Sequence, residues 1–367
     1  MITALNAGGL SFGSYQQVAL DNMIQRAANA LQKKQEKLTA TYEKKNDAIT
    51  KESDRLVKLS SNIKSAQVAI QNGTEGIEEV QGYLDDMRSA LGEIERTNSD
   101  YYRDQYDEAL RKLNSAVDSY SPAYNPIGRV QDRSTWTPND ITYNASFSGS
   151  TTTLNGVYIG ADFRIEDESG TTWIPDLSSQ TLTEYTSYNT QKPSDSDSTG
   201  RTTSTSTGIT AASPPDANGN QTFTMIIDTQ EVTVTGKVVK GGLGITGKWN
   251  HNNLATPEDI QSALDELNAA SSKMDAARAQ MTTNEQVVKG HENGIKKKQD
   301  DLKGEQKDAL YESLEGMTDL EQEYDQQVAA MQRNLEAMSS QQQAYLSVFK
   351  SSLASSGNNP LFVDMNV

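Results

Sequence analysis

Two short segments of the sequence have residue types and spacings typical of ligand-binding loops. In GGLGITGKW, Gly242, Gly247 and Lys248 have the spacing of a phosphate-binding loop, in which backbone N–H groups and a lysine hold phosphate oxygens. That chemistry also needs a Ser or Thr after the lysine to hold magnesium, and a helix after the loop. Here Trp249 takes the place of the hydroxyl residue, and HNNLATP follows. We therefore expect a tight β-turn and no nucleotide site.

The second segment is DANGNQTF, which has oxygen ligands at the spacing of a calcium loop. Asp216, Asn218 and Asn220 stand at alternate positions. Gln221 replaces the glycine that the loop needs for its sharp turn, and Ile227 replaces the bidentate glutamate. We therefore expect at most weak, adventitious calcium binding.

The remaining polar groups form no recognisable catalytic pattern. The two histidines, His251 and His291, are far apart in the sequence and are expected to be surface residues. Ser-x-x-Lys spacing occurs at Ser61 and Ser347, but the other motifs of Ser-Lys acyl enzymes are missing. The sequence contains no cysteine, which excludes thiolate chemistry and disulfides. We expect no catalytic residues, no metal ligands and no cofactor, and hence no enzyme.

The composition limits the partners that the chain can have. It has 367 residues, a net charge of −17 and only 35% hydrophobic residues. Nucleic acids and anionic membranes would repel such a chain, so neither nucleic-acid binding nor membrane insertion is expected. The low hydrophobic fraction is typical of long helices that bury only one face. The first twenty residues lack the pattern of a cleaved signal peptide, so export would use another route.

The distribution of the nine prolines divides the chain into three parts. None lies in segments 1–121 or 258–359, as expected for uninterrupted helix, and most lie in the middle, as do all three tryptophans. The middle also alternates apolar and polar residues with period two, in stretches such as GVYIGADFRIED and TFTMIIDTQEVTVTGKVVK. Between these stretches, the segment 194–221 is rich in Ser, Thr, Gly and Asp and is predicted to be an exposed loop.

These patterns predict an α+β fold. A long antiparallel α-helical coiled-coil bundle would form from the N- and C-terminal segments, with an inserted β-rich central domain. The predicted parts are an N-terminal helical assembly region, a β-rich surface-exposed domain, a C-terminal helical assembly region and a tail, at 1–121, 122–255, 256–356 and 357–367.

Apolar stripes at heptad spacing indicate where the helices pack. A helix is predicted from about Ser14 to Gln71, and the stripe resumes after Asn72-Gly73. The C-terminal block begins at a predicted capping box, formed by Thr256 and Asp259. Its last stretch, AMQRNLEAMSSQQQAYLSVFKSSL, has an apolar stripe that needs a partner surface. The candidate assembly residues on these stripes, with two neighbouring arginines, are Ile63, Ile77, Val80, Leu84, Met87, Arg88, Leu91, Leu267, Met274, Arg278, Met331, Leu335, Met338, Tyr345 and Phe349.

Several short motifs resemble those of bacterial flagellins, and their order along the chain is also similar. NGTEGIEEVQGYLDDMRSAL, with Thr74-Glu75-Gly76 and Arg88, resembles the flagellin helix that follows a T-E-G motif. TTTLNGVYIG resembles the F-N-G turn of that family, and LDELNAASSKMDAARAQMTTNEQVV resembles its returning helix, with an Ala-Arg pair and Asn284. MTDLEQEYDQQVAAMQ is similar to the acidic, Gln-rich approach to the flagellin C-terminus. The two chain ends also look like the termini of the flagellar cap protein.

The resemblance implies a structural subunit that self-assembles into an extracellular helical filament. It further implies secretion through the flagellar export apparatus with a chaperone, a location in the bacterial flagellum, and other copies of the same chain as the main partner. Three alternatives stay open: a flagellar hook-junction or cap protein, which would form rings or short oligomers; a type III secretion needle-tip protein or coiled-coil adhesin; and a lytic enzyme carried on a filament. No catalytic constellation supports the last of these.

Overall fold

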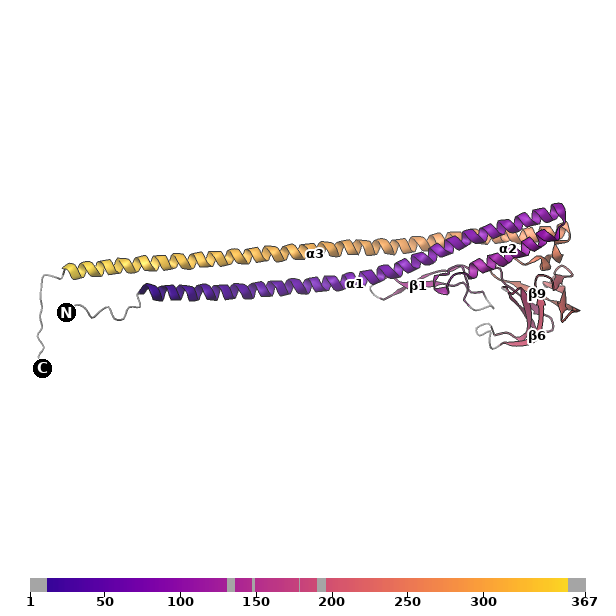
Figure 1. Cartoon of the computed structure of the whole chain (residues 1–367), viewed down its shortest axis with the longest axis horizontal. Helices are drawn as coiled ribbons and strands as arrows, with labels where there is room; N and C mark the ends of the chain where they lie inside the picture. The colour runs from indigo at the N-terminus through magenta and orange to yellow at the C-terminus, as the bar shows by residue number, and fades with distance from the viewer. Residues whose placement is uncertain (1–11, 131–135, 147–148, 178, 190–195, 356–367) are drawn as a thin grey trace. The chain divides into compact units, whose positions relative to one another are not determined.

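The computed structural model describes residues 12–130, 136–146, 149–177, 179–189 and 196–355. The chain has a mixed helix and sheet structure (Figure 1). It divides into two compact units, which are described separately. The central unit is Arg55–Lys297, and the terminal unit combines Met1–Asp54 with Lys298–Val367. The predicted tail, 357–367, lies outside the described residues.

Two long helices and several short elements make up the described chain. Helix α1 is Phe12–Thr97 and helix α3 is Pro257–Ser355; between them in sequence lie α2 (Asp100–Asp118) and the 3-10 helices η1 (Pro122–Tyr124) and η3 (Lys248–Leu254). The predicted capping box begins α3. Thr256 N–H donates to Asp259 Oδ2 at 2.9 Å, and Asp259 N–H donates to Thr256 Oγ1 at 3.3 Å.

The break predicted after Asn72-Gly73 does not exist, because α1 continues through both residues. A side chain at Gly73 would meet Pro126: a Cβ there would lie 2.6 Å from Pro126 Cγ. At Gly76, a Cβ would lie 2.4 Å from Ile127 Cδ1. The two glycines let the segment after η1 pack closely on α1. This packing outweighs the cost of about 1 kcal/mol per glycine in a helix.

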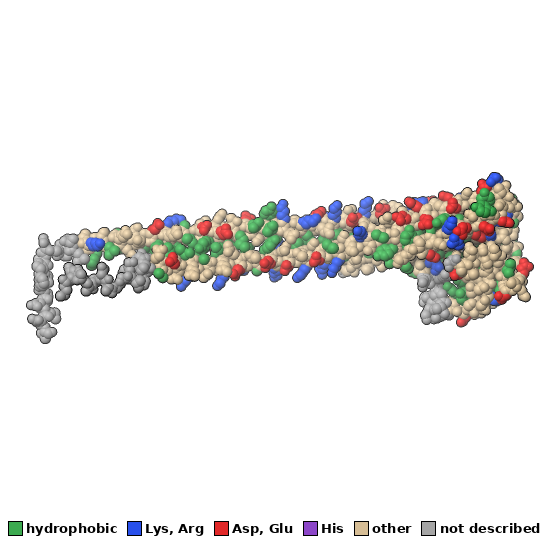
Figure 2. Space-filling view, viewed as in Figure 1, with side chains coloured by type: hydrophobic (Ala, Val, Ile, Leu, Met, Phe, Trp, Pro, Cys, Tyr) green, Lys and Arg blue, Asp and Glu red, His purple; other side chains and the backbone are tan. Residues whose placement is uncertain are grey.

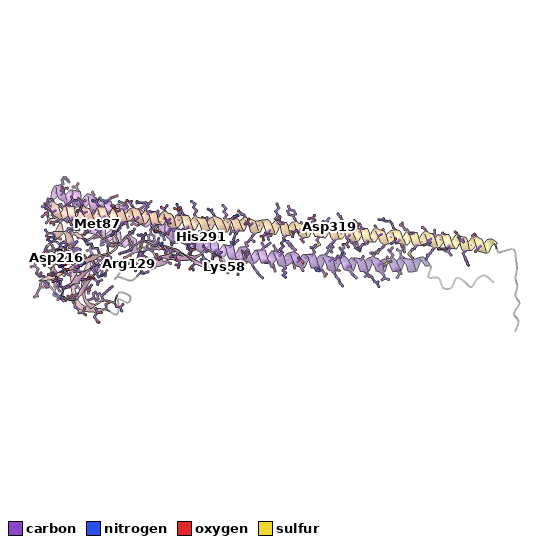
Figure 3. The ribbon with its side chains drawn as sticks, turned by 180° about the vertical axis from the view of Figure 1, so that it is seen from behind. Lys58, Met87, Arg129, Asp216, His291 and Asp319 are labelled. Atoms are coloured by element: carbon purple, nitrogen blue, oxygen red, sulfur yellow. The ribbon has the colours of Figure 1, made fainter. Side chains whose placement is uncertain are left out.

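The helical core of the central unit lies where α1, α2 and α3 meet. Apolar residues repeat along α1 at helical spacing, and their side chains are fully buried against the equally spaced apolar face of α3. Met87 of α1 belongs to this core (Figure 3). Helix α2 adds Tyr106, Leu113 and Val117, and Tyr106 also donates a hydrogen bond from its hydroxyl to the Thr246 carbonyl at 3.2 Å.

A seven-stranded antiparallel sheet forms the β-rich part of the central unit. The strand order is β6-β5-β4-β3-β9-β8-β7. The strands are β3 (Phe163–Asp167), β4 (Thr172–Asp176), β5 (Thr181–Ser187), β6 (Asp197–Ser204), β7 (Ile209–Ala211), β8 (Asn220–Ile227) and β9 (Gln230–Lys240). Strands β6 and β8 also come close to each other, so the sheet curls around a core that contains Trp173 and Phe223.

The hairpin of β8 and β9 shows how the sequence sets the register of this sheet. Ile227 pairs with Gln230 across a two-residue turn, in which Asp228 and Thr229 have φ angles of 50° and 67°. Positive φ at both turn residues matches the right-handed twist of the strands. Alternate residues of β8 then point into the core, as the period-two pattern predicts.

The prediction of one long exposed loop over 194–221 is wrong. Strands β6 and β7 lie within this segment, and β8 begins there. The many threonines favour strands because they are β-branched. The buried Glu184 also anchors β6: its carboxylate accepts hydrogen bonds from Thr199 Oγ1 at 2.7 Å and from Arg201 Nη1 at 2.9 Å. The polar composition of segment 194–221 therefore did not indicate strands β6 and β7.

A separate two-stranded sheet lies beside α1 and α3. It pairs β1 (Ile141–Asn144) with β2 (Thr151–Leu154). Asn62 of α1 donates from Nδ2 to the Asn144 carbonyl at 3.3 Å. The Tyr143 hydroxyl lies 2.7 Å from Nδ1 of His291 on α3 (Figure 3).

In the terminal unit, α1 and α3 run antiparallel and side by side. Lys34 Nζ lies 2.8 Å from Glu323 Oε2, and Lys45 Nζ lies 3.0 Å from Glu312 Oε2. From the first ion pair to the second, the residue number increases on α1 and decreases on α3, so the two helices run in opposite directions. Hydrophobic side chains lie along the line where the two helices face each other, with charged side chains on the outer sides (Figure 2). Ile49 and Ala309 are among the buried residues here.

Candidate assembly surface

The C-terminal part of α3 exposes a group of large apolar side chains. Five residues make up this surface, here called the apolar end of α3: Met338, Tyr345, Leu346, Val348 and Phe349. Their exposed fractions range from 54% for Met338 to 68% for Tyr345. Large apolar side chains that are exposed close together usually mark a contact site.

The apolar residues of this segment occupy more of the helix surface than one neighbouring helix can cover. Met331 and Leu335, closer to the centre of α3, are half-buried. Tyr345, Leu346, Val348 and Phe349 fall within little more than one turn, so they point in several directions around the helix axis. One partner helix covers a single stripe. Complete burial of this segment would therefore need further helices.

Eight of the predicted assembly residues lie in the core of the central unit. Each has an exposed fraction of at most 2%: Ile63, Ile77, Val80, Leu84, Met87, Leu91, Leu267 and Met274. A second copy of the chain cannot touch these side chains while the unit is folded. The apolar stripes that contain these residues are therefore covered within one chain. Their role is to hold the helices together.

The two predicted arginines have different environments. Arg88 joins α1 to α3: its Nη2 donates to the Leu267 carbonyl at 3.1 Å and to the Ser271 hydroxyl, and its Nη1 lies 3.0 Å from Asp85. Arg278 is about half exposed and pairs with Asp275, one turn away on the same helix. Arg88 therefore belongs to the interior contacts of the subunit, and Arg278 to its surface.

Residues from the flagellin-like motifs meet in the central unit. Asn284 of α3 donates from Nδ2 to the carbonyl of Asn155 in the L-N-G motif, at 2.9 Å. Gly156 follows, and a Cβ there would lie only 2.2 Å from the carbonyl oxygen of Asn139. Such a contact with rigid backbone leaves room only for glycine. The motif is thus used in the structure to bring a loop against α3.

The polar side chains of the two ligand-like loops contact other groups of the same chain. Lys248 of GGLGITGKW is buried and pairs with Asp104 of α2 at 2.6 Å, so its ammonium group does not face solvent as a phosphate site would need. In DANGNQTF, Asp216 Oδ1 accepts backbone hydrogen bonds from Asn218 and Asn220 at 2.8 and 2.9 Å, which closes a turn. Among the described residues, no group of three or more His, Asp or Glu side chains has the geometry of a metal site.

His251 is buried, which corrects its prediction as a surface residue. Its Nε2 lies 3.2 Å from Glu266 Oε2, and its Nδ1 lies 3.2 Å from the Ser262 hydroxyl. Burial opposes the charge of Glu266, but the contacts with His251 and Lys240 prevail and lower the pKa of its carboxyl. No local sequence pattern marks this cluster, because its members come from η3, β9 and α3.

Sequence comparison adds no family assignment. No protein-family model matches this sequence, and no curated protein gives a match. No described helix is both long enough and apolar enough to cross a membrane.

Two members of the apolar end of α3 do not belong to the heptad stripe. Leu346 and Val348 lie beside the Tyr345–Phe349 stripe and are 59% and 64% exposed. A search for one stripe selects positions that repeat every three or four residues and passes over apolar neighbours. The signal that would have found them is the density of large apolar residues in AYLSVF.

The contact between β1 and α3 makes a testable pH prediction. Burial raises the pKa of Tyr143 from 10.0 to about 12. The neutral phenol therefore stabilises the folded state below the unfolded pKa, and this contribution is lost as the pH rises through about 12. Tyr143→Phe should lower the free energy of unfolding by about 0.5–1.5 kcal/mol at neutral pH, because the hydrogen bond to His291 is lost. Above pH 10, the difference in unfolding free energy between the variant and the unmodified protein should become smaller. Urea unfolding of both proteins over this pH range measures that difference, and a difference that stays constant would contradict the raised pKa of Tyr143.

Proposed function

We propose that the chain is a flagellin-like structural subunit, which self-assembles into an extracellular helical filament. The observation that carries this proposal is the apolar end of α3, which stays exposed in the single chain. In the filament, copies of this segment pack against one another. Burial of one Leu, Met or Phe side chain contributes about 1.5–3 kcal/mol, so a few residues at each contact are enough to drive assembly after the ordering costs.

The apolar stripes are covered to different extents in the two units, and this difference supports the proposal. In the central unit, the stripes of α1 and α3 are covered within one chain. In the terminal unit, Leu310, Tyr311 and Leu314 are exposed by 44%, 58% and 55% in addition to the apolar end of α3. A subunit whose apolar helix faces are only partly covered is suited to repeated contacts with identical neighbours.

The contacts of the motif residues give separate support to the flagellin resemblance. Asn284, Asn155 and the glycines of the T-E-G segment were chosen from sequence alone, and each makes a specific contact in the central unit. In the proposed subunit the long helices form an antiparallel coiled-coil bundle, from which the β-rich segment is inserted. The subunit leaves the cell through the flagellar export apparatus with the help of a chaperone.

Concentration-dependent sedimentation of the purified chain tests the proposal. We expect a sharp onset of large assemblies above a critical concentration, and loss of this onset when residues 331–367 are removed. Removal of 357–367 alone is the matched control and should preserve assembly, since the apolar end of α3 stays intact. Unchanged filaments from the chain without 331–367 would contradict the proposal. Small oligomers of fixed size from the full chain would instead favour the hook-junction or cap alternative.

A further inference from the structure

Lys248 and two aspartates of α2 form a charged group, at the edge of the interior, that the proposed function does not use. Lys248 Nζ lies 2.6 Å from Asp104 Oδ1 and 3.7 Å from Asp107 Oδ2. Asp104 and Asp107 are three residues apart and so lie on the same face of α2. The side chains of Lys248 and Asp107 are each only 11% exposed, whereas that of Asp104 is 69% exposed. One amine thus faces two carboxyl groups with very different environments.

The carboxyl group of Asp107 is held in a fixed orientation. Its Oδ1 accepts a hydrogen bond from the backbone N–H of Lys248 at 2.9 Å. Its Oδ2 is buried and has no hydrogen-bond partner among the described residues. The absence of a side chain at Gly247 permits this arrangement, because a Cβ there would lie 3.1 Å from Asp107 Oδ1 and 2.9 Å from Trp249 Cδ1.

The environment of Asp107 makes its carboxyl easier to protonate than an exposed aspartate. Burial is the main cause, and it raises the pKa of this carboxyl from 3.8 to about 6, although the contacts with Lys248 act in the opposite direction. A neutral carboxylic acid is attacked by an amine far more readily than a carboxylate is. Asp104 is exposed and next to the same amine, so it is placed to accept a proton.

We propose that Lys248 Nζ and the side-chain carboxyl of Asp107 condense to form an intramolecular isopeptide bond, with Asp104 as the base. Asp104 takes one proton from the Lys248 ammonium group, and the free amine attacks Cγ of Asp107. The backbone N–H of Lys248 stabilises the negative charge that develops on Oδ1. The Nζ–Cγ bond forms and the Cγ–Oδ2 bond breaks.

The atoms balance without an oxidant or another reactant. Oδ2 leaves as water, with its own proton and a second proton from the amine. The first amine proton stays on Asp104 until solvent removes it. A cavity of about 50 Å³, lined in part by Asp107, Gly247 and Trp249, lies beside the reacting group and has room for the released water, which needs about 10–15 Å³.

A second lysine–carboxylate pair in the central unit, which is partly exposed, shows which features matter. Lys240 forms an ion pair with Glu266, which also accepts hydrogen bonds from the N–H and hydroxyl of Thr246 at 2.9 and 3.0 Å. The contacts with His251 and Lys240 lower the pKa of the Glu266 carboxyl, and an ionised carboxylate is a poor acceptor for an amine. We therefore expect this pair to stay ionic.

The bond would link α2 to the segment that leads into α3. It would close a loop from residue 107 to residue 248, which holds the whole β-rich segment. A cross-link over a loop of about 100 residues or more restricts the unfolded chain and so stabilises the folded protein, as a disulfide does. In a chain without cysteine, a lysine–aspartate bond gives the same constraint without oxidation.

Intact mass spectrometry of the folded, full-length chain tests this inference. After incubation near pH 6–7 and denaturation, we expect a mass lower than the sequence mass by one water molecule. Fragmentation of the digested protein should yield one cross-linked peptide pair that joins Lys248 to Asp107. The full sequence mass after incubation would overturn the proposal. A cross-link between Lys248 and Asp104 would overturn the assigned roles.

Four variants separate the roles of the side chains. Lys248→Arg and Asp107→Ala should have no mass deficit, and a deficit that persists in either would place the water loss elsewhere and overturn the proposal. Asp104→Asn should form the bond about 100-fold more slowly, the lower end of the usual effect of a general base. An unchanged rate would overturn its assignment as the base. Lys240→Met is the matched control and should keep the full deficit.

Discussion

Leu346→Glu combined with Phe349→Glu should prevent assembly at concentrations at which the unmodified chain assembles, and should leave the subunit folded. Both side chains are exposed in the single chain, by 59% and 63%, so their replacement removes little from the subunit itself. At a contact between subunits, each would contribute about 1.5–3 kcal/mol by burial. Loss of both should therefore raise the critical concentration by about 100-fold to 10,000-fold. The burial of two carboxylates adds a further cost.

Sedimentation and circular dichroism together measure this prediction. The control carries Gln341→Glu and Gln343→Glu, which add the same charge to exposed positions of the same helix. Control protein should assemble with only a small rise in critical concentration, because charge alone acts weakly at an exposed surface. Assembly of the Leu346/Phe349 variant at the concentration of the unmodified chain would show that the apolar end of α3 is not a contact.

Leu84→Ala and Leu314→Ala should affect different properties of the protein, although the chemical change is the same. The first should lower its stability, and the second should weaken its assembly. Leu84 is fully buried in the helical core of the central unit, and its truncation should cost about 2–5 kcal/mol of unfolding free energy. Leu314 is 55% exposed in the terminal unit, so its truncation should change the unfolding free energy by less than about 0.5 kcal/mol. If Leu314 lies at a contact between subunits, its truncation should instead weaken assembly.

Denaturant unfolding and the critical concentration should be measured on both leucine variants. We expect a large loss of stability for Leu84→Ala and a higher critical concentration for Leu314→Ala. The reverse pattern would contradict the division between a core within one chain and a surface between chains. Equal loss of stability in both variants would show that the terminal unit is already fully packed.

The elements of this fold that depend on local patterns could be predicted from the sequence. The capping box at Thr256 and Asp259 needs only two side chains three residues apart, and it forms as expected. The β8–β9 hairpin follows from the alternation of its residues and from a short turn. The apolar stripes of α1 and α3 correctly gave the helix faces that pack in the central unit.

Features that depend on distant partners could not be predicted. The stripe pattern is the same for Leu84 and for Met338, and only the number of neighbouring elements makes one buried and the other exposed. His251 is buried because Glu266 and Ser262 meet it from another helix, and local sequence carries no sign of that. Strand β6 was missed because its polar threonines pair with β5 and its arginine reaches Glu184.

Negative-stain electron microscopy of the purified chain over a concentration series tests whether the chain forms filaments. We expect long filaments of uniform width above a critical concentration, and helical reconstruction should place residues 331–349 at contacts between subunits. Monomers or closed rings at every concentration would contradict this expectation.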